Sequence, residues 1–219
     1  MCADLGDTMK SVGGLRWPRG PRNRLGAVIR AQNLSKRFGD KRVIEALDLD
    51  VPHGGFVLLT GPNGSGKTTL LRLCAGLAAP TGGELEIAVS RGQIGFLAHE
   101  PLVYRELTAL ENLDLYARLY RIPERRERCG AMLERFGLWR DRNARAATLS
   151  RGMLQRLALC RAFLHDPDLL LLDEPFEGLD AEGSDLLLQE LTSRKATALV
   201  ATHDPALFDS RATGRLALA

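Results

Sequence analysis

The chain has 219 residues, of which 45% are hydrophobic and 26% charged, and its formal net charge is +3. These values are typical of a globular protein with one well-buried domain, or one domain and a small subdomain, and they exclude two full domains. No apolar run approaches the roughly 18 residues of a membrane-spanning helix, and no secretory signal is visible at the N-terminus, so we expect a cytosolic chain.

The distribution of charge and cysteine excludes two further classes. Residues 1–27 hold five basic and two acidic residues, which accounts for the whole net charge. The rest of the chain is therefore close to neutral, and no nucleic-acid partner is expected. Cys2, Cys74, Cys129 and Cys160 are scattered without CxxC spacing, which predicts reduced thiols and not a zinc site or a redox pair.

The N-terminal segment differs in composition from the rest of the chain. Residues 1–27 are rich in Gly, Pro and Arg and lack periodicity, which predicts a disordered basic tail or sequence upstream of the true start. A basic arm that touches anionic lipid is the weaker alternative. The ordered pattern begins with the strand VIRAQNLSKRF, and it continues through VIEALDLDV to the buried strand FVLLT at 56–60.

Strands and helices then alternate. A helix is predicted over about 67–77, followed by the strand-like segments ELEIAV and QIGFLA and by a helical pattern over 108–145. Further on come a helix at 154–164, the buried strand in DLLLLDEP, the helix GSDLLLQELTSR and the strand in TALVATH. This order predicts an α/β domain over 28–219 that carries a helical subdomain at about 100–150.

The segment GPNGSGKT follows a predicted strand and opens a predicted helix, which is the context that the GxxxxGK[ST] phosphate loop requires. Glycine lets backbone amides turn toward phosphates, Lys67 supplies a positive charge, and the Thr68 hydroxyl can bind Mg²⁺. We expect ATP to contact the loop residues Gly61, Pro62, Asn63, Gly64, Ser65, Gly66, Lys67, Thr68 and Thr69.

Two later motifs supply candidate catalytic groups. DLLLLDEP ends a strand with Asp173, which could hold Mg²⁺ through water, and Glu174, which could polarise the attacking water. The alternative is that the two acids only cap the next turn. His203 in ATHD follows the last predicted strand and could reach the terminal phosphate.

The segment TLSRGMLQRL resembles a second anion-binding helix start. Ser150 and Gly152 would present a hydroxyl, backbone amides and the positive end of a helix dipole. Because the phosphate loop already surrounds its phosphates on one side, we expect this contact to serve ATP held by another copy, in a head-to-tail homodimer or a paired ATPase. An ordinary N-capped helix is the alternative.

These motifs, in this order, resemble ABC transporter ATP-binding subunits over residues 28–219. The resemblance includes GPNGSGKTT, LSRGMLQR, LLLLDEP, EGLD and the ATHD histidine, although Arg151 and Met153 depart from the commoner LSGGQ. It implies a P-loop NTPase of the ABC ATPase type, with a RecA-like core, an antiparallel β subdomain and a helical subdomain. It also implies an integral membrane permease as partner and a peripheral position on the cytoplasmic face of the cell membrane.

The resemblance assigns further residues. Phe38 would stack on adenine beside Val43, and Asp180 would communicate between the two sites. A core role is the alternative for Phe38. The glutamine that usually touches magnesium is replaced in FLAHEP, where either His99 or Glu100 takes its place or both are simple loop residues.

Within the family, the segments FLAHEP and LTALENLDLYARLY favour the haem exporter subunit of cytochrome c maturation. The implied function is ATP hydrolysis that drives export of haem or a related component, with a permease helix docking beside His99 and Glu100. An exporter of drugs, lipids or polysaccharides would share every motif. A non-transport P-loop ATPase is the alternative from another class.

Overall fold

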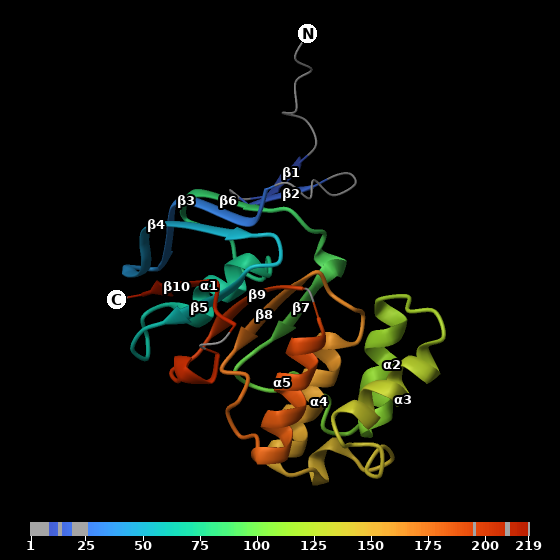
Figure 1. The fold of residues 1–219 in the computed structure, drawn as a ribbon. Helices are drawn as coiled ribbons and strands as arrows, with labels where there is room; N and C mark the ends of the chain where they lie inside the picture. The colour runs from blue at the N-terminus through green and yellow to red at the C-terminus, as the bar shows by residue number, and fades with distance from the viewer. Residues whose placement is uncertain (1–8, 13–14, 19–25, 195, 209–210, 219) are drawn as a thin grey trace.

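The computed structural model describes residues 9–12, 15–18, 26–194, 196–208 and 211–218, which form two sheets and their covering helices (Figure 1). The first sheet has the strand order β1-β2-β6-β3-β4. Its strands are β1 Met9–Val12, β2 Leu15–Pro18, β3 Ala27–Phe38, β4 Lys41–Pro52 and β6 Gly82–Ile87. The second has the order β10-β5-β9-β8-β7 and is parallel throughout. Its strands are β5 Phe56–Thr60, β7 Ile94–Leu97, β8 Leu169–Asp173, β9 Thr197–Ala201 and β10 Gly214–Ala217.

The helices lie in two places. Their bounds are α1 Lys67–Cys74, α2 Ala109–Leu119, α3 Arg125–Arg135, α4 Arg151–Phe163 and α5 Ala181–Ser193, with short 3-10 turns η2 Arg91–Gln93, η3 Ala146–Thr148 and η4 Pro205–Phe208. Figure 1 shows α1 between the two sheets, α4 and α5 on the opposite face of the parallel sheet, and α2 and α3 to one side. None of the helices in the described ranges combines the length and the apolar character that spanning a bilayer requires.

Strand β8 explains how the parallel sheet is covered. All five of its residues are buried, and their side chains alternate between the two faces. Leu169 and Leu171 belong to an apolar cluster with α1 and the first sheet, whereas Leu170 and Leu172 belong to a second cluster with α2 to α5. An unbroken apolar run is therefore what a central parallel strand requires.

The N-terminal segment differs from the sequence-based expectation. The structure describes β1 and β2 within residues expected to be disordered, and β2 pairs in parallel with β6 through Leu15 and Leu85. Leu15 is 2% exposed and belongs to the core cluster between the sheets. Disorder is thus the wrong prediction for these two strands, and the remainder of 1–25 lies outside the described residues.

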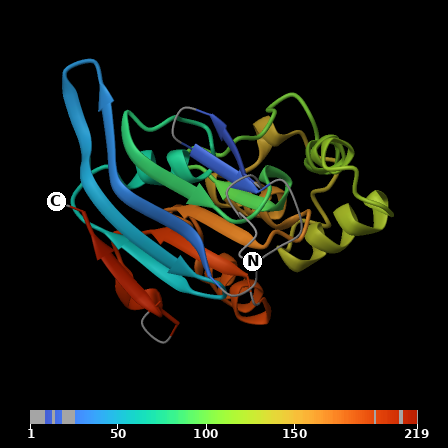
Figure 2. The same cartoon turned by 90° about the horizontal axis from the view of Figure 1, so that it is seen from above.

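The helical segment 108–145 is also more broken than its pattern suggests. Helix α2 begins at a capping box, in which the Thr108 side chain accepts from the Glu111 N–H and Glu111 accepts from the Thr108 N–H. Arg121 and Glu124, both with positive φ, then separate α2 from α3. Figure 2 shows this pair of helices on the side of the molecule away from the β3–β4 hairpin.

The cysteines are buried free thiols wherever the structure describes them. Cys74 lies in the cluster between the sheets, and Cys129 and Cys160 lie in the cluster around α2 to α5. Burial raises the pKa of Cys74 to about 12 and that of Cys129 to about 11. These three are free thiols, which agrees with the expectation of reduced cysteines, and Cys2 lies outside the described residues.

Candidate nucleotide-binding site

A cavity of about 830 Å³ opens at the carboxyl ends of β5, β8 and β9. In parallel α/β sheets, this edge is where ligands bind. The cavity is lined by Phe38, Lys41, Val43, Asn63, Gly64, Gly66, Lys67, Thr68, Thr69, His99, Asp173, Glu174, Glu177 and His203. Nearly all the residues that the sequence assigns to one nucleotide therefore lie together.

The phosphate loop turns where only glycine fits. Gly61 has φ 141°, and a Cβ there would lie 2.2 Å from the Leu218 carbonyl oxygen. Gly66 has φ 101° and precedes α1, whose N-terminus receives no hydrogen bond from a capping side chain. The first N–H groups of α1 therefore face the cavity and can receive an anion.

Lys67 is held inside this loop. The residue is 7% exposed, and its Nζ donates to the carbonyl oxygens of Gly61 at 2.7 Å and Pro62 at 3.1 Å. Its charge is thus fixed at the wall of the cavity, where anions would be attracted most strongly because the site is partly shielded from water.

Thr68 and Asp173 are in direct contact. The Thr68 Oγ1 donates to the Asp173 Oδ2 at 2.7 Å, which joins the start of α1 to the end of β8. Asp173 is 2% exposed, and burial raises its pKa while the Thr68 hydrogen bond lowers it. The two side chains offer adjacent oxygen ligands of the kind that Mg²⁺ prefers.

Glu174 and His203 form the second polar pair. The Glu174 Oε2 lies 2.8 Å from the His203 Nδ1 and accepts from the His203 backbone N–H at 3.2 Å. Glu174 has φ 49°, and its own N–H donates to the Ala201 carbonyl at the end of β9. Neighbouring strands β8 and β9 thus bring the two side chains together.

The hairpin of β3 and β4 forms the outer wall. Phe38 is 55% exposed, and the Lys36 Nζ lies 4.8 Å from the centroid of its ring. This exposure excludes the alternative of a core aromatic. Lys41 and Val43 line the same wall, and Lys41 is a lining residue that the sequence motifs do not include.

The two candidates in FLAHEP differ in their position relative to the cavity. His99 lines the cavity, and its Nδ1 lies 3.4 Å from the Glu177 Oε2. Glu100 is exposed and is not among the lining residues. Glu177 is the first residue of the EGLD motif, but the sequence analysis assigned a role only to Asp180 in that motif; the position of Glu177 one turn after Glu174 is a signal that could have pointed to it.

Ser150, Gly152 and Asp180 lie outside the cavity lining, as do the loop residues Gly61, Pro62 and Ser65. Ser150 caps α4 by accepting from the Met153 N–H at 3.2 Å, and Gly152 lies in the first turn of that helix. Asp180 caps α5, and it accepts from the Arg156 Nη2 at 2.5 Å. The Arg156 hydrogen bond lowers the pKa of Asp180. Ser150 and Gly152 are therefore not positioned with the phosphate loop of their own chain.

Comparison with known proteins identifies the family. The profile of the ABC transporter family matches residues 44–177. The aliphatic sulfonates import ATP-binding protein SsuB 1 of Pseudomonas syringae pv. tomato is 40% identical over 81% of this chain and 65% of its own length. The Nod factor export ATP-binding protein I of Cupriavidus pinatubonensis is 36% identical over 82% of this chain and 59% of its own length. The chain thus spans less than two thirds of these relatives.

Solved structures agree with this result. The ATP-binding subunit of an ABC transporter has a TM-score of 0.81 and 31% identity, over 87% of this chain and 85% of that one. The cassette MJ0796, whose dimeric structure in a post-hydrolysis state holds ADP and Pi, has a TM-score of 0.73 and 30% identity, over 82% and 89% of the two chains. The fold is that of the ABC ATPases, as expected, and the chain belongs to the ABC transporter family.

Proposed function

We propose that this chain binds and hydrolyses ATP and thereby drives an ABC membrane transporter. The observation that carries the proposal is that Lys67, the Thr68–Asp173 pair and the Glu174–His203 pair converge on one cavity. We assign residues 28–219 to one nucleotide-binding domain, with its helical subdomain at about 100–150.

The chain's own residues suit a nucleoside triphosphate. Residues 61–69 and the free N–H groups of α1 would surround the phosphates, Lys67 would neutralise their charge, and Phe38 would stack on the base beside Val43. Thr68 and Asp173 would hold Mg²⁺, with His99 in place of the usual glutamine. When bound, Mg²⁺ would neutralise charge on the transferred phosphoryl group.

Glu174 would orient the attacking water. Its carboxylate faces the cavity, and His203 fixes one of its oxygens. Phosphoryl transfer depends mostly on positioning and charge stabilisation, so a carboxylate held in place is sufficient as the water-orienting group. His203 would also contact the terminal phosphate.

Ser150 and Gly152 would complete the site of a second subunit. They lie at a helix start outside the cavity of their own chain, and the related cassette MJ0796 is dimeric. A head-to-tail homodimer, or a pair with another ATPase subunit, would bring this helix start to the partner's ATP, with Asp180 as the link between the two sites.

The membrane partner would bind beside His99. Leu102 and Tyr104 follow this residue and are 45% and 51% exposed. Such apolar side chains suit a cytoplasmic helix of a permease, which would place this subunit peripherally on the cytoplasmic face of the membrane.

The transported substance is set by the permease. The relatives named above concern sulfonate import and Nod factor export, so they give no support to haem export, which stays a prediction from sequence resemblance. Mild crosslinking in native membranes, followed by mass spectrometry, would identify the permease. Components of cytochrome c maturation would support haem export, and a different permease would exclude it.

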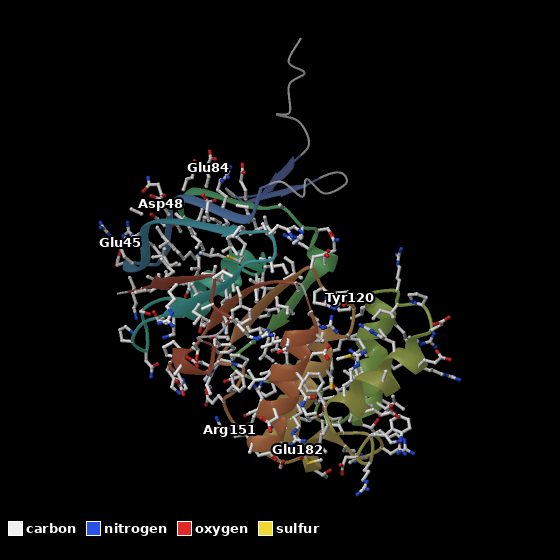
Figure 3. The ribbon with its side chains drawn as sticks, viewed as in Figure 1. Glu45, Asp48, Glu84, Tyr120, Arg151 and Glu182 are labelled. Atoms are coloured by element: carbon white, nitrogen blue, oxygen red, sulfur yellow. The ribbon has the colours of Figure 1, made fainter. Side chains whose placement is uncertain are left out.

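ATP hydrolysis is tested with Glu174→Gln. The variant should lose at least about a hundredfold in kcat, because the water-orienting carboxylate is removed, and it should form dimers in the presence of ATP. Glu84→Gln is the matched control, since Glu84 is exposed on the first sheet (Figure 3) and is not among the residues that line the cavity. Equal ATPase rates for Glu174→Gln and the control would contradict the assignment of Glu174, and absence of ATP-dependent dimers would favour a non-transport P-loop ATPase.

A further inference from the structure

The side chains of His99, Glu177 and Arg151, which come from separate segments, form a series of contacts at the edge of the cavity. The His99 Nδ1, in the loop after β7, lies 3.4 Å from one carboxylate oxygen of Glu177. The other oxygen of Glu177 accepts from the Arg151 Nη2 at 2.5 Å. Glu177 therefore joins the wall of the cavity to the first residue of α4.

Glu177 is well placed to respond to what the cavity holds. Its N–H donates to the Glu174 carbonyl at 3.0 Å, so it lies one turn beyond the residue assigned to water orientation. Its side chain lines the cavity and is 35% exposed. A triphosphate would add several negative charges near this carboxylate and would repel it.

Arg151 is packed closely against the same turn. Gly178 has φ 79°, and a Cβ there would lie 3.2 Å from the Arg151 Nε. A Cβ on Gly152 would lie 3.0 Å from the Gly178 carbonyl oxygen. Arg151 (Figure 3) is the first residue of α4 and directly follows Ser150, which caps this helix. The first turn of α4, which Ser150 caps, thus lies against the turn that follows Glu177, and the Arg151 side chain is 76% exposed.

We propose that Glu177 is a positioning residue that couples a subunit's own nucleotide to the helix start that it offers to a second copy. The inference rests on the proposed function. Repulsion by the bound triphosphate breaks the longer contact between Glu177 and His99, while the Glu177 carboxylate keeps its existing hydrogen bond to Arg151. The pair with Arg151, no longer shared with His99, then fixes the start of α4, including Ser150, for contact with the partner's ATP.

The test is a double-mutant cycle on the full chain. Glu177→Gln, Arg151→Gln and the double variant are compared for kcat, KM and the Hill coefficient of ATP hydrolysis, and for the Kd of a fluorescent ATP analogue at concentrations where the chain is monomeric. Each single variant should lose about tenfold in kcat and lose cooperativity. The Kd should not rise in either variant, and it should fall in Glu177→Gln, because that substitution removes a charge that repels the triphosphate. The double variant should be no worse than either single variant.

Two controls separate coupling from general effects. Asp50→Asn removes an exposed ion pair of the same kind, between Arg30 and Asp50 at 3.0 Å on the first sheet, and should leave every parameter unchanged. Arg151→Lys keeps the positive charge and should recover most of the kcat. If Glu177→Gln fails to fold, Glu177→Asp takes its place. Aspartate keeps the negative charge, but its shorter side chain cannot contact both His99 and Arg151.

The outcomes distinguish two failures. Losses that multiply in the double variant, or single variants that behave like Asp50→Asn, would overturn the coupling while ATP hydrolysis by the wild type stands. A wild-type chain that neither binds nor hydrolyses ATP would overturn the proposed function itself.

Discussion

A stack of two rings connects the helical subdomain to the parallel sheet. Tyr120, next to the end of α2, lies parallel to His165, with ring centroids 3.9 Å apart and an interplanar angle of 8°. The His165 Nε2 lies 3.1 Å from the Ile94 carbonyl oxygen in β7. Nearby, Arg161 donates to the Phe96 carbonyl at 2.8 Å and lies over the Tyr116 ring. These contacts hold α2 and α4 against the strand that leads to the cavity.

His165 should make stability depend on pH. Burial lowers its pKa to about 4, whereas a histidine in the unfolded chain titrates near 6.5. Because the unfolded chain binds the proton more readily, the free energy of unfolding should fall as the pH decreases from about 6.5 to about 4. His165→Phe keeps a ring against Tyr120 and removes this titration, so urea unfolding at several pH values should give a flatter profile.

The control for this prediction is His53→Phe. His53 is exposed, so the steep decline of the wild type should persist in this variant. A His165→Phe profile as steep as that of the wild type would mean that other groups cause the acid sensitivity.

Motif residues at the phosphate loop and the strand ends were the most predictable part of the site. Lys67 begins α1, Asp173 ends β8 and His203 follows the end of β9 by two residues, all at positions that the local pattern indicates. The choice between His99 and Glu100 could not be made from the sequence, because the two residues are adjacent in a loop and the sequence does not show which of the two side chains faces the cavity. Glu177 was missed for a related reason, since its contacts with His99 and Arg151 join segments far apart in the chain.

At the scale of elements, β7 and α4 approach each other more closely than any side chain on Gly95 would allow. A Cβ on Gly95 would lie 2.4 Å from the Ala162 carbonyl oxygen and 2.8 Å from the Pro167 Cγ. The strand and the helix are therefore in contact at this glycine, and the loop that carries His99 begins directly after β7.

The substitution Gly95→Ala should push β7 and α4 apart. The substitution should lower the free energy of unfolding by about 1–3 kcal/mol through overpacking, and it should reduce ATPase activity because the shift of β7 displaces His99. Gly92→Ala is the matched control, since nothing lies within 4 Å of its added Cβ. Denaturation curves that coincide for the two variants would contradict the close packing.

Elements with strong local patterns were predicted, and those that depend on distant partners were not. The four-leucine strand β8 needs cover on both faces, and its unbroken apolar run indicates this. By contrast, β1 and β2 lie in a segment that contains Gly and Pro and shows no alternation of apolar and polar residues. Strand β2 joins the sheet by pairing with β6, which is distant in the sequence. Strand β10 was also missed, because it lies at the edge of the sheet beside β5 and none of its four residues is fully buried, with Arg215 and Ala217 exposed.

At the scale of the whole molecule, the proposed dimer predicts complementation between two inactive variants. Lys67→Ala disables the phosphate loop, and Gly152→Asp disables the helix start that serves the other copy. In a mixed dimer, one site combines the intact loop of one chain with the intact helix start of the other, so mixing should restore ATPase activity to about a quarter of the wild-type rate.

The control mixes a chain that carries both substitutions with a chain that carries Lys67→Ala alone. No intact phosphate loop is present in that mixture, so activity should stay at background. Failure of the first mixture to exceed either variant alone would mean that the site is completed within a single chain.

The burial of Cys74 and Cys129 on opposite faces of the parallel sheet has a consequence for the kinetics of opening. Thiol reagents attack only the thiolate, so both sulfurs are protected while their layers remain closed. In a variant that carries Cys2→Ser and Cys160→Ala, only Cys74 and Cys129 remain. The modification rate of each of these thiols would then measure how often its own layer opens. If bound nucleotide slows the modification of one thiol more than that of the other, the layer that contains the slower thiol is the one that nucleotide stabilises more against opening.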